Sequence, residues 1–537
     1  MQQSQDTSTH PNPLNWKDAV LFIASFVYIY LHLFQFPYTP IYFEGDHLLA
    51  LSNALRLLDG EVMYRDFFHF TPPGTELYYV VLFSIFGVKM WVVDLTIVAL
   101  GMAQIWLIWF FARRIFSGLY IYLPAVVFLA VGFHVLGPDG SNRLFSVVFV
   151  LAGVAVLFNV RSIPNLALAG ALCGLSSFFV QPRGLLGIVG IAIFLLWENY
   201  QYGFNLRALV REIFCLSFAF GLVIFATQIY FVWQTGFSTY YFDMVTFILN
   251  NYRHDPMNNL AAYFGDLPNF GKYLEVLSPP AAVFRFIRAW IPLFFYYVII
   301  PLVYFVFLFV VWKRKKDQIS YEQKARLMLL CMVGLALAAG VSAPTAFRLF
   351  QVAIPGIIIF VWLVQQYNFS RKFVPASFLA MILLIFAYAA QRQLVTKYYM
   401  DLPVGRSAFL SAEVLAKYEW VKEHTHNGEV FYETHHPSFY FPFNLKNPTP
   451  IYLVRDSEYT PYFQIESIVH ALENDPPNLI VWEGSYSKDA ASRLPGDNVE
   501  LLWEYISKNY EMKAEFRSFG EYNLGSERDA QMWERKK

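Results

Sequence analysis

An acidic segment directly follows the first long apolar run of the chain. Residues 43–47 read Phe-Glu-Gly-Asp-His, so Glu44 and Asp46 stand two positions apart at the end of that run. An ionised carboxylate at the edge of hydrocarbon is costly unless it is solvated, paired or used in function. A carboxylate can also act as a general base that takes a proton from a hydroxyl group. The segment therefore indicates either a solvated loop or a catalytic base, and spacing alone leaves both open.

Arginines at the ends of two other apolar runs could hold an anion. Arg183 follows Gln181 and Pro182, and Arg348 follows the segment 343–347. A guanidinium group is planar, stays charged and can grip two phosphate oxygens at once. The alternative for each arginine is contact with lipid headgroups. Arg143, shortly after Asp139, is a weaker candidate, for which an ion pair within the loop is the alternative.

The composition is that of a membrane protein. Of the 537 residues, 57% are hydrophobic and 15% are charged, and the mean hydropathy is +0.40. Lysine plus arginine equals aspartate plus glutamate, which argues against a nucleic-acid partner. Cys173, Cys215 and Cys331 fall inside apolar runs, where they are expected to pack rather than form disulfides. The first 16 residues lack a basic leader region, so the run that follows is expected to be a retained anchor.

About eleven segments are candidate membrane spans, each requiring about 20 mostly apolar residues. Their centres lie near residues 27, 101, 127, 152, 173, 191, 223, 301, 334, 358 and 382. The basic clusters then fall on one side, which predicts a plasma or inner membrane protein with a cytoplasmic N-terminus; they are Lys17, Arg113 and Arg114, Arg161, Arg207 and Arg211, 313–316, and 371–372. This predicted topology places Asp46, Arg143, Arg183 and Arg348 together at the outer face of the membrane.

The chain changes character after residue 390. Residues 391–537 are polar and alternate between helical and strand patterns, which predicts a small extracytoplasmic α/β domain. The expected elements are helices near 410–425, 463–473 and 498–509, and strands near 429–433, 478–482 and 511–518. Four histidines in this region fit no common zinc pattern and are interpreted as solvated surface; they are His424, His426, His435 and His436. The predicted division is a cytoplasmic tail 1–16, a transmembrane catalytic domain 17–390 with a first outer loop 37–89, and the domain 391–537.

The first outer loop resembles a known family. Asp46, Leu57-Leu58-Asp59-Gly60, Tyr64-Arg65-Asp66-Phe67 and Pro72-Pro73 follow one another in the order and spacing of the integral-membrane glycosyltransferases of the GT-C type. The sequence looks similar to the dolichyl-phosphate-mannose protein mannosyltransferases and to the aminoarabinose transferases. The resemblance covers roughly residues 15–390 and is strongest in this loop. His47 departs from it, since many relatives have a second acid there.

The resemblance implies a function and a set of site residues. It implies transfer of a sugar, with inversion, from a polyprenyl-phosphate donor to a lipid, glycan or protein hydroxyl at the outer membrane face. Asp46 would be the catalytic base. The candidate substrate-binding residues are Glu44, His47, Arg65, Asp66, His69, Asp139, Arg143, Arg183 and Arg348. No organic cofactor is expected, and a divalent cation is left open.

Two other classes of function compete with this interpretation. A transporter or flippase would place ionisable residues at mid-bilayer in paired halves, whereas the charges here stand at the ends of apolar runs and no inverted repeat is found. A scaffold protein would bind a partner through its outer domain and would not need Asp46. A transferase is therefore favoured, with the transporter as the alternative.

Overall fold

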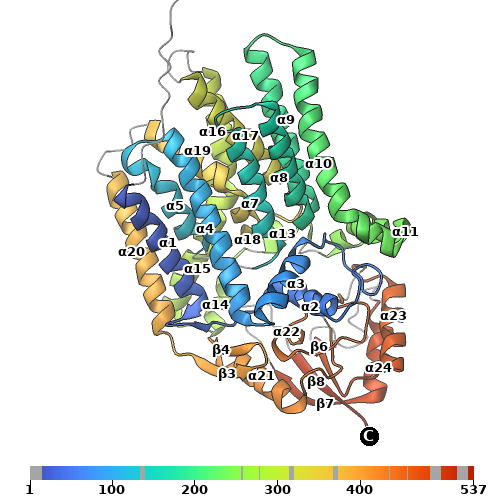
Figure 1. Ribbon diagram of the computed structural model, residues 1–537. Coiled ribbons are helices and arrows are strands. Elements are labelled where there is room, and N and C mark those ends of the chain that lie inside the picture. Colours follow the sequence, from blue (N-terminus) through green and yellow to red (C-terminus); the bar gives the residue numbers. More distant parts are fainter. Residues whose placement is uncertain are drawn as a thin grey trace, which may run out of the picture.

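The computed structural model describes residues 15–133, 140–255, 258–265, 267–276, 278–313, 320–366, 373–434, 436–455, 458–483, 498–516 and 530–537. A bundle of long helices forms one part of the molecule, and a smaller unit of helices and strands lies at one end of it (Figure 1). We call the described residues from β3 onward the C-terminal domain. The fold class expected from the sequence, a helical membrane protein with a small C-terminal α/β domain, is confirmed.

Among the described residues, six helical stretches are long and apolar enough to cross a membrane. They are α1 (Trp16–Leu33), α4 (Met90–Ile115), α9 (Gln181–Gln201), α10 (Leu206–Thr235), the stretch Pro279–Lys313 and α20 (Phe373–Leu394). That stretch comprises α15 (Pro279–Phe294), η6 (Phe295–Ile299) and α16 (Ile300–Lys313). A seventh span is formed if α18 (Ala346–Val352) and α19 (Ile354–Gln366), bent by 71°, are counted together. The chain is thus a multi-pass membrane protein.

The remaining predicted spans are helices too, but they do not all have the length of a span. They are α5 (Leu123–Phe128) with η2 (Leu129–Phe133), α7 (Asn142–Leu157), α8 (Ile163–Phe179) and α17 (Tyr321–Ala339). At about 1.5 Å per residue, α7 and α8 are shorter than the roughly 30 Å hydrocarbon core. Glycine lets α8 approach its neighbour closely: a Cβ at Gly170 would lie 2.1 Å from the carbonyl oxygen of Leu216 in α10. By length and composition the described chain offers six or seven spans, where the sequence predicted about eleven.

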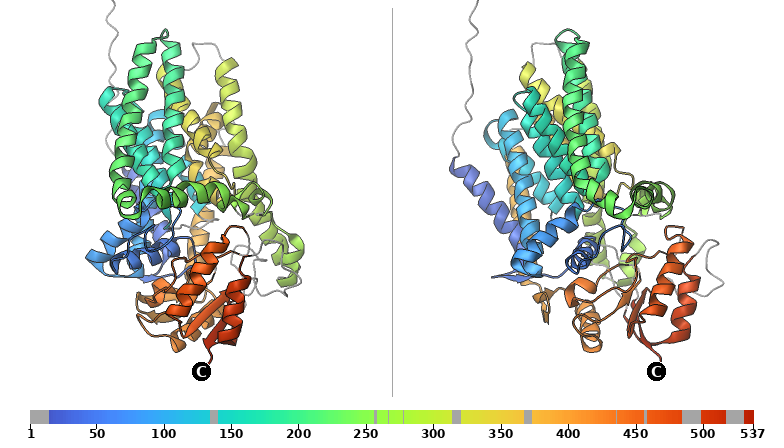
Figure 2. Two further views of the ribbon diagram at one scale, coloured as in Figure 1. Left: turned by 90° about the vertical axis from the view of Figure 1, so that its right-hand side faces the viewer. Right: turned by 45° about the vertical axis from the view of Figure 1, so that its right-hand side comes forward.

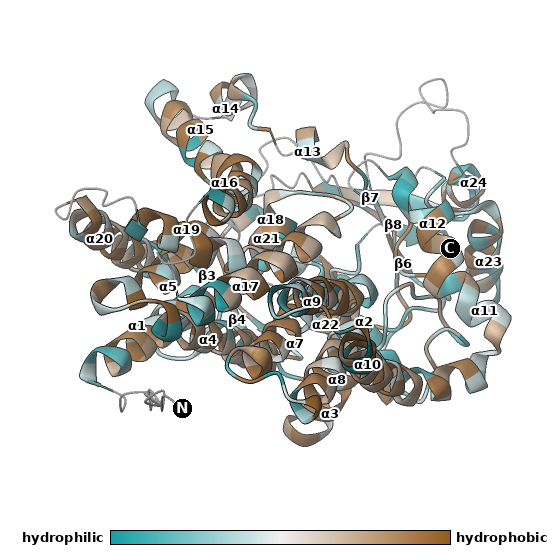
Figure 3. Ribbon diagram, turned by 90° about the horizontal axis from the view of Figure 1, so that it is seen from above, coloured by the Kyte–Doolittle hydropathy of each residue, from teal (hydrophilic) through white to brown (hydrophobic). Residues whose placement is uncertain are grey.

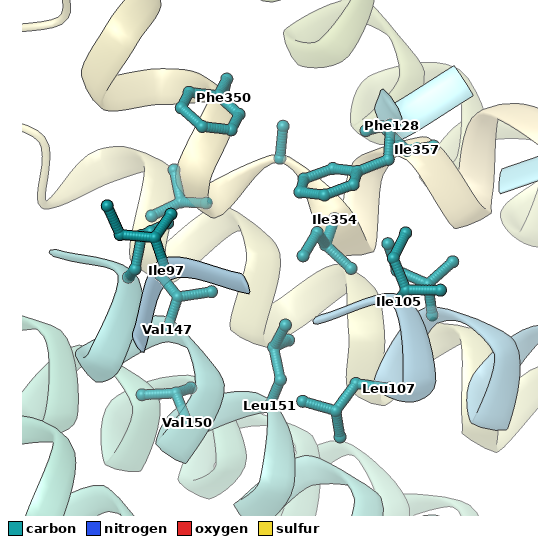
Figure 4. Close-up of a cluster of buried hydrophobic side chains, with 14 of the residues drawn as sticks. Ile97, Ile105, Leu107, Phe128, Val147, Val150, Leu151, Phe350, Ile354 and Ile357 are labelled. Carbon is teal, nitrogen blue, oxygen red and sulfur yellow. The ribbon is translucent and has the colours of Figure 1, made fainter. Parts of the chain in front are cut away.

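Apolar side chains from five helices form the centre of the bundle (Figure 4). In a bundle surrounded by lipid, close van der Waals packing of such side chains, rather than their removal from water, holds the helices together. The labelled residues come from α4, α5, α7, α18 and α19, and each is at most 2% exposed; they are Ile97, Ile105, Leu107, Phe128, Val147, Val150, Leu151, Phe350, Ile354 and Ile357. This cluster fixes α7 and α18 relative to each other. The outer surface of the bundle is also apolar, as the brown segments of α16 and α20 show (Figure 3).

The end of the bundle that meets the C-terminal domain carries short, irregular elements. The helices α2 (His47–Leu58) and α3 (Gly74–Phe86) lie between the bundle and the domain (Figure 1). Gly60, with φ of 93°, lets the chain turn directly after α2. The segment from α10 to α15 runs across this end of the bundle (Figure 2); it contains α11 (Phe237–Tyr241), η3 (Phe242–Thr246), α12 (Phe247–Asn250), η4 (Tyr252–His254), α13 (Ala262–Gly265) and α14 (Phe270–Val276).

The C-terminal domain begins with the hairpin of β3 (Tyr398–Leu402) and β4 (Gly405–Phe409), which was not predicted. A four-stranded mixed sheet follows, in the order β5-β6-β8-β7, with β5 and β6 parallel and the other pairs antiparallel. Its elements are α21 (Ala412–His424), β5 (Tyr432–Glu433), α22 (Tyr440–Phe443), α23 (Tyr462–Asn474), β6 (Leu479–Glu483), α24 (Glu500–Asn509), β7 (Tyr510–Phe516) and β8 (Ala530–Arg535). All six elements predicted here have a counterpart, while β8 and α22 were missed. The backbone N–H of Tyr42 donates to the carbonyl of Ala408 at 2.8 Å, which joins the first loop to the hairpin.

Candidate active site

Asp46 stands where the bundle meets the C-terminal domain. It directly precedes α2, and its Oδ2 lies 2.6 Å from Nη1 of Arg143 in α7. Its Oδ1 lies 3.9 Å from Nε2 of His436 in the C-terminal domain. Although protein surrounds the carboxylate, 53% of its side-chain surface is exposed. Asp46 is therefore held by both parts of the molecule and remains accessible to a small ligand.

The three arginines singled out in the sequence all lie in the first turns of helices that begin near one another. Arg143 is in α7, Arg183 in α9 and Arg348 in α18. Arg183 is close enough to both of the others for their charges to interact with its own, and the charge of Arg348 also reaches Asp46. The N-terminal end of a helix carries a partial positive charge, which favours an anion and disfavours a cation. Arginines gathered at such ends make this place strongly electropositive.

Hydrogen bonds hold two of these guanidinium groups in place. Nη1 of Arg183 donates to the backbone oxygen of Arg143 at 2.5 Å and to Oγ of Ser146 at 3.0 Å. Nη2 of Arg183 donates to Oε1 of Gln351 at 3.0 Å. Nη2 of Arg348 donates to Oδ1 of Asn258 at 2.9 Å. The cluster is thus built from α7, α9, α18 and the segment after η4.

Local sequence explains why the first turns of α9 and α18 lie where they do. Pro182 fits the first turn of α9, since it needs no backbone donor there. A Cβ at Gly184 would lie 2.0 Å from the carbonyl oxygen of Cys173, so glycine lets the start of α9 press against α8. Thr345 caps α18 by accepting from the backbone N–H of Arg348 at 3.3 Å. Pro355 in the first turn of α19 is consistent with the break that separates α18 from α19.

The electrostatic surroundings keep Asp46 ionised. Burial raises the pKa of its carboxyl group, but the charges of Arg143 and Arg348 and the contact with His436 lower the pKa more, and the result lies well below the usual value. The position at the N-terminus of α2 also favours a negative charge. Asp46 is accordingly an anion at neutral pH, poised beside an excess of positive charge.

Glu44, only two residues earlier, faces the C-terminal domain. Its Oε1 lies 2.8 Å from Nζ of Lys417 and accepts from the hydroxyl of Tyr418 at 3.1 Å. The hydroxyls of Tyr42 and Tyr418 are 2.8 Å apart, and each lies within hydrogen-bond distance of the backbone oxygen of Ser438, at 3.1 and 3.2 Å. These contacts tie the first loop to α21 and to the segment that carries His436.

An aromatic cluster stands beside this contact. Ring centroids of Phe70 and Tyr252 are 5.1 Å apart, those of Phe247 and Tyr459 are 5.3 Å apart, and those of Tyr252 and Tyr459 are 6.0 Å apart. Burial raises the pKa of Tyr459 well above its usual value, and the charge of Asp46 contributes. The first loop, the segment 242–254 and the C-terminal domain therefore form an aromatic wall near Asp46.

Arg65 and Asp66, both candidates from the sequence, pair with each other. Nε of Arg65 donates to Oδ1 of Asp66 at 2.9 Å, and Nη2 donates to Oδ2 at 2.8 Å. Asp66 also accepts from the backbone N–H of Val62 at 2.7 Å, and Arg65 reaches Gln234 at 3.3 Å. These contacts shape the turn after α2, and they do not bring the pair to Asp46.

The other candidates from the first loop are buried. His47 is 1% exposed, and its ring lies 4.7 Å from that of Phe43. His69 is 4% exposed; its Nε2 lies 3.1 Å from Oε1 of Glu76, and its Nδ1 lies 3.2 Å from Nδ2 of Asn53. These contacts resemble a packed core pair more than a ligand site. Asp139 lies outside the described residues.

A divalent cation does not fit the surroundings of Asp46. In the described parts of the chain, no group of three or more histidine, cysteine, aspartate or glutamate side chains is arranged to hold a metal ion. The side chains that face the carboxylate of Asp46 include Arg143 and Arg348, whose fixed positive charges repel a metal cation. We therefore derive no step through a metal.

Sequence reasoning missed residues that only the fold brings to the site. His436 was interpreted as solvated surface, yet its side chain is largely buried against Asp46, about 390 positions away in the chain. Gln351, Asn258 and Lys417 were not singled out at all. No local spacing marks any of these residues, because their partners are distant in sequence.

Comparison with known proteins gives matches by structure. No protein-family model matches the sequence, and no curated protein matches it. The structure of ArnT from Cupriavidus metallidurans bound to undecaprenyl phosphate is 11% identical, covers 97% of this chain and 98% of its own, and has a TM-score of 0.47. The Archaeoglobus fulgidus oligosaccharyltransferase in complex with Zn and sulfate is 13% identical, covers 93% of this chain and 72% of its own, and has a TM-score of 0.49. Both are GT-C glycosyltransferases, the class that the first outer loop resembles. At such identities and scores they assign no donor, acceptor or site residue to this chain.

Proposed function

We propose that this chain transfers a sugar, with inversion, from a polyprenyl-phosphate carrier to an acceptor hydroxyl at the extracytoplasmic membrane face. The observation that carries the proposal is a half-exposed Asp46 beside Arg143 and Arg348, with Arg183 next to these two arginines. Guanidinium groups in the first turns of helices repel one another and the helix dipoles, which costs free energy unless an anion lies between them. A phosphate group supplies that anion.

The leaving group of the proposed reaction is this phosphate. As the bond from the anomeric carbon breaks, its electron pair moves to the phosphate oxygen, and negative charge grows there. Donors placed in advance at such a position stabilise the transition state more than the ground state. Arg183, held in place by Gln351 and Ser146, adds its positive charge to this position.

Asp46 is the acid that lies within reach of both substrates in this scheme. Its Oδ2 is paired with Arg143. A bound phosphate competes for Arg143, which relieves part of the positive charge that holds down the pKa of Asp46. Donor binding thereby makes the carboxylate a better proton acceptor for the incoming hydroxyl. The aromatic wall of Tyr252 and Tyr459 offers apolar contact to the sugar beside it.

An apolar groove supports a lipid carrier. It lies along α15 and η6, and it is lined by Phe286, Ile287, Trp290, Ile291, Phe294, Phe295 and Ile299. The next residue of η6, Tyr296, has its ring 6.4 Å from that of Phe350 in α18, two residues after Arg348. An isoprenoid chain that leaves the arginine cluster along η6 would reach this groove and remain in apolar surroundings.

The proposed orientation has its own test. In a variant whose native cysteines are replaced, a cysteine at Lys313 is expected to be shielded from an impermeant thiol reagent in intact cells. A cysteine at His426, which is exposed on the C-terminal domain, is expected to react. Equal labelling at both positions would contradict an extracytoplasmic site.

Turnover tests the chemistry directly. Purified protein is incubated with a panel of polyprenyl-phosphate sugars and candidate acceptors, and release of polyprenyl phosphate is measured beside formation of a glycosylated product. We expect release with at least one donor, and loss of release in Asp46→Asn. Transport of the intact donor across vesicles without release would instead support a flippase.

A further inference from the structure

The C-terminal domain places a histidine against the candidate base. Oδ2 of Asp46 faces Arg143, whereas Oδ1 faces Nε2 of His436 at 3.9 Å. The side chain of His436 is 15% exposed. Its Nδ1 is buried without a hydrogen-bond partner among the described residues. The two oxygens of one carboxylate are thus assigned to different parts of the molecule.

The contact is held in place from both flanks. Glu44, two residues before Asp46, binds Lys417 and Tyr418. The backbone oxygen of Ser438, two residues after His436, lies 3.2 Å from the hydroxyl of Tyr418, and the backbone N–H of Ser438 donates to the backbone oxygen of His436 at 2.7 Å. The same tyrosine therefore fixes the approach of both chain segments. Such a two-sided tether is what a site needs to keep two reacting groups in register.

We propose that His436 is the terminal proton acceptor of the transfer, so that the C-terminal domain supplies a catalytic residue to the membrane-embedded site. This inference rests on the proposed function. Imidazole is the side chain that most often moves protons near neutral pH. A carboxylate beside it stabilises the imidazolium that forms.

The step balances as follows in atoms and charge. The acceptor oxygen forms its bond to the anomeric carbon, and the bond from that carbon to the phosphate oxygen breaks with its electron pair on the phosphate. Oδ1 of Asp46 takes the proton of the acceptor hydroxyl and passes it to Nε2 of His436. The imidazolium is then paired with the Asp46 carboxylate and releases its proton to water after the product leaves.

The predicted pH dependence involves every charged group that the described contacts place around this pair. Arg143 and Arg348 approach Asp46 from α7 and α18, and Tyr459 approaches it from the C-terminal domain. Glu44 and Lys417 form the neighbouring pair on the tether. The arginines stay charged over the working range. A rise in kcat with pH that is lost in His436→Gln is therefore assigned to His436.

The experiment compares His436→Gln with the wild type in the transfer assay over a range of pH. The matched control is His424→Gln, because His424 is in the same domain but pairs with Glu534 at 3.7 Å. We expect kcat to fall at least roughly tenfold in His436→Gln, with loss of the rising limb and an unchanged KM for the donor. His424→Gln is expected to keep the wild-type profile.

A second variant guards against a folding defect. In His436→Gly, added imidazole is expected to restore part of kcat, which neither a misfolded protein nor a purely structural role would show. Wild-type transfer together with an unchanged pH profile in His436→Gln would overturn this inference alone, as would a folded His436→Gly that imidazole does not rescue. Absence of any transfer by the wild type would overturn the proposed function, and this inference with it.

Discussion

The two sides of the loop 43–47 offer very different partners to two acids of the same chain segment. On the bundle side, Asp46 meets Arg143 at the start of a helix and keeps half of its side-chain surface exposed. On the domain side, Glu44 meets Lys417 and Tyr418 and is 23% exposed. Although they stand only two residues apart, Asp46 is an accessible anion among several positive charges, whereas Glu44 is a largely covered anion paired with one cation.

This difference assigns different work to the two acids. A largely covered ion pair makes the structure around it more rigid, and its loss changes the positions of the segments that it joins. An accessible carboxylate among cations can exchange its partner for a ligand. Asp46 is therefore expected to control the chemical step, and Glu44 the placement of the C-terminal domain.

Removal of the Asp46 carboxylate gives the largest expected effect. Asp46→Asn keeps the shape of the side chain but loses the proton acceptor, and a general base contributes about 10²–10⁴-fold to a rate. We expect kcat to fall by that order while binding of the donor persists, measured by turnover and by equilibrium binding separately. Near-normal turnover of Asp46→Asn would remove the contrast between the two acids.

The arginine cluster gives the second prediction. Arg348→Leu is expected to weaken donor binding at least roughly tenfold, because the loss of one partner from a charged, partly buried pair costs about 2 kcal/mol or more. Arg348→Lys should recover part of the affinity, since lysine keeps the positive charge but cannot bind two phosphate oxygens at once as the planar guanidinium does.

A matched control for this prediction is Arg288→Leu. Arg288 also belongs to a helix of the bundle, but it contacts Tyr388, whose hydroxyl accepts from Nη2 at 3.2 Å. Its replacement should leave donor affinity unchanged. Equal loss in both leucine variants would indicate a general effect of surface charge.

The helices were predictable because lipid demands long apolar runs, and all eleven predicted centres fall in helices. Their lengths were harder to predict, since α7 and α8 are packed by glycines against longer neighbours. The hairpin of β3 and β4 was missed, and so was its contact with the segment around Ile41, more than 350 residues away. Hydropathy carries no information about such pairings.

The candidate site was partly predictable, because the ends of the apolar runs show which residues lie at the same end of the bundle. The topology predicted from the sequence placed Asp46 and three arginines at one end of the bundle, and the structure brings them together there. Their roles remain predictions. His436 could not be found, because sequence patterns give the identity of a histidine but not the surface against which its domain folds.

The tether provides a third and smaller effect. Glu44→Gln removes the charge opposite Lys417 but keeps a hydrogen-bonding group of the same size. We expect kcat to fall less than tenfold and donor affinity to stay unchanged, because the chemical groups remain and only their spacing relaxes. A variant as inactive as Asp46→Asn would show instead that the base lies two residues upstream.

Asp243 offers the smallest effect and tests whether cations set the behaviour of these acids. It is 4% exposed in η3, near Tyr64, and burial raises its pKa to about 8. An aspartate of an unfolded chain has a pKa of about 3.9, so the folded state binds more protons between these values, and stability falls as pH rises from about 4 to about 8. Asp243→Asn should remove this slope and increase stability at pH 8 by about 1–3 kcal/mol, a shift of a few degrees in thermal unfolding. Asp475→Asn, at an exposed position, should leave the slope unchanged. If stability still falls with pH in Asp243→Asn, burial of Asp243 is not the cause of that fall. Asp243 would then no longer serve as the buried acid without cations against which Asp46 is compared.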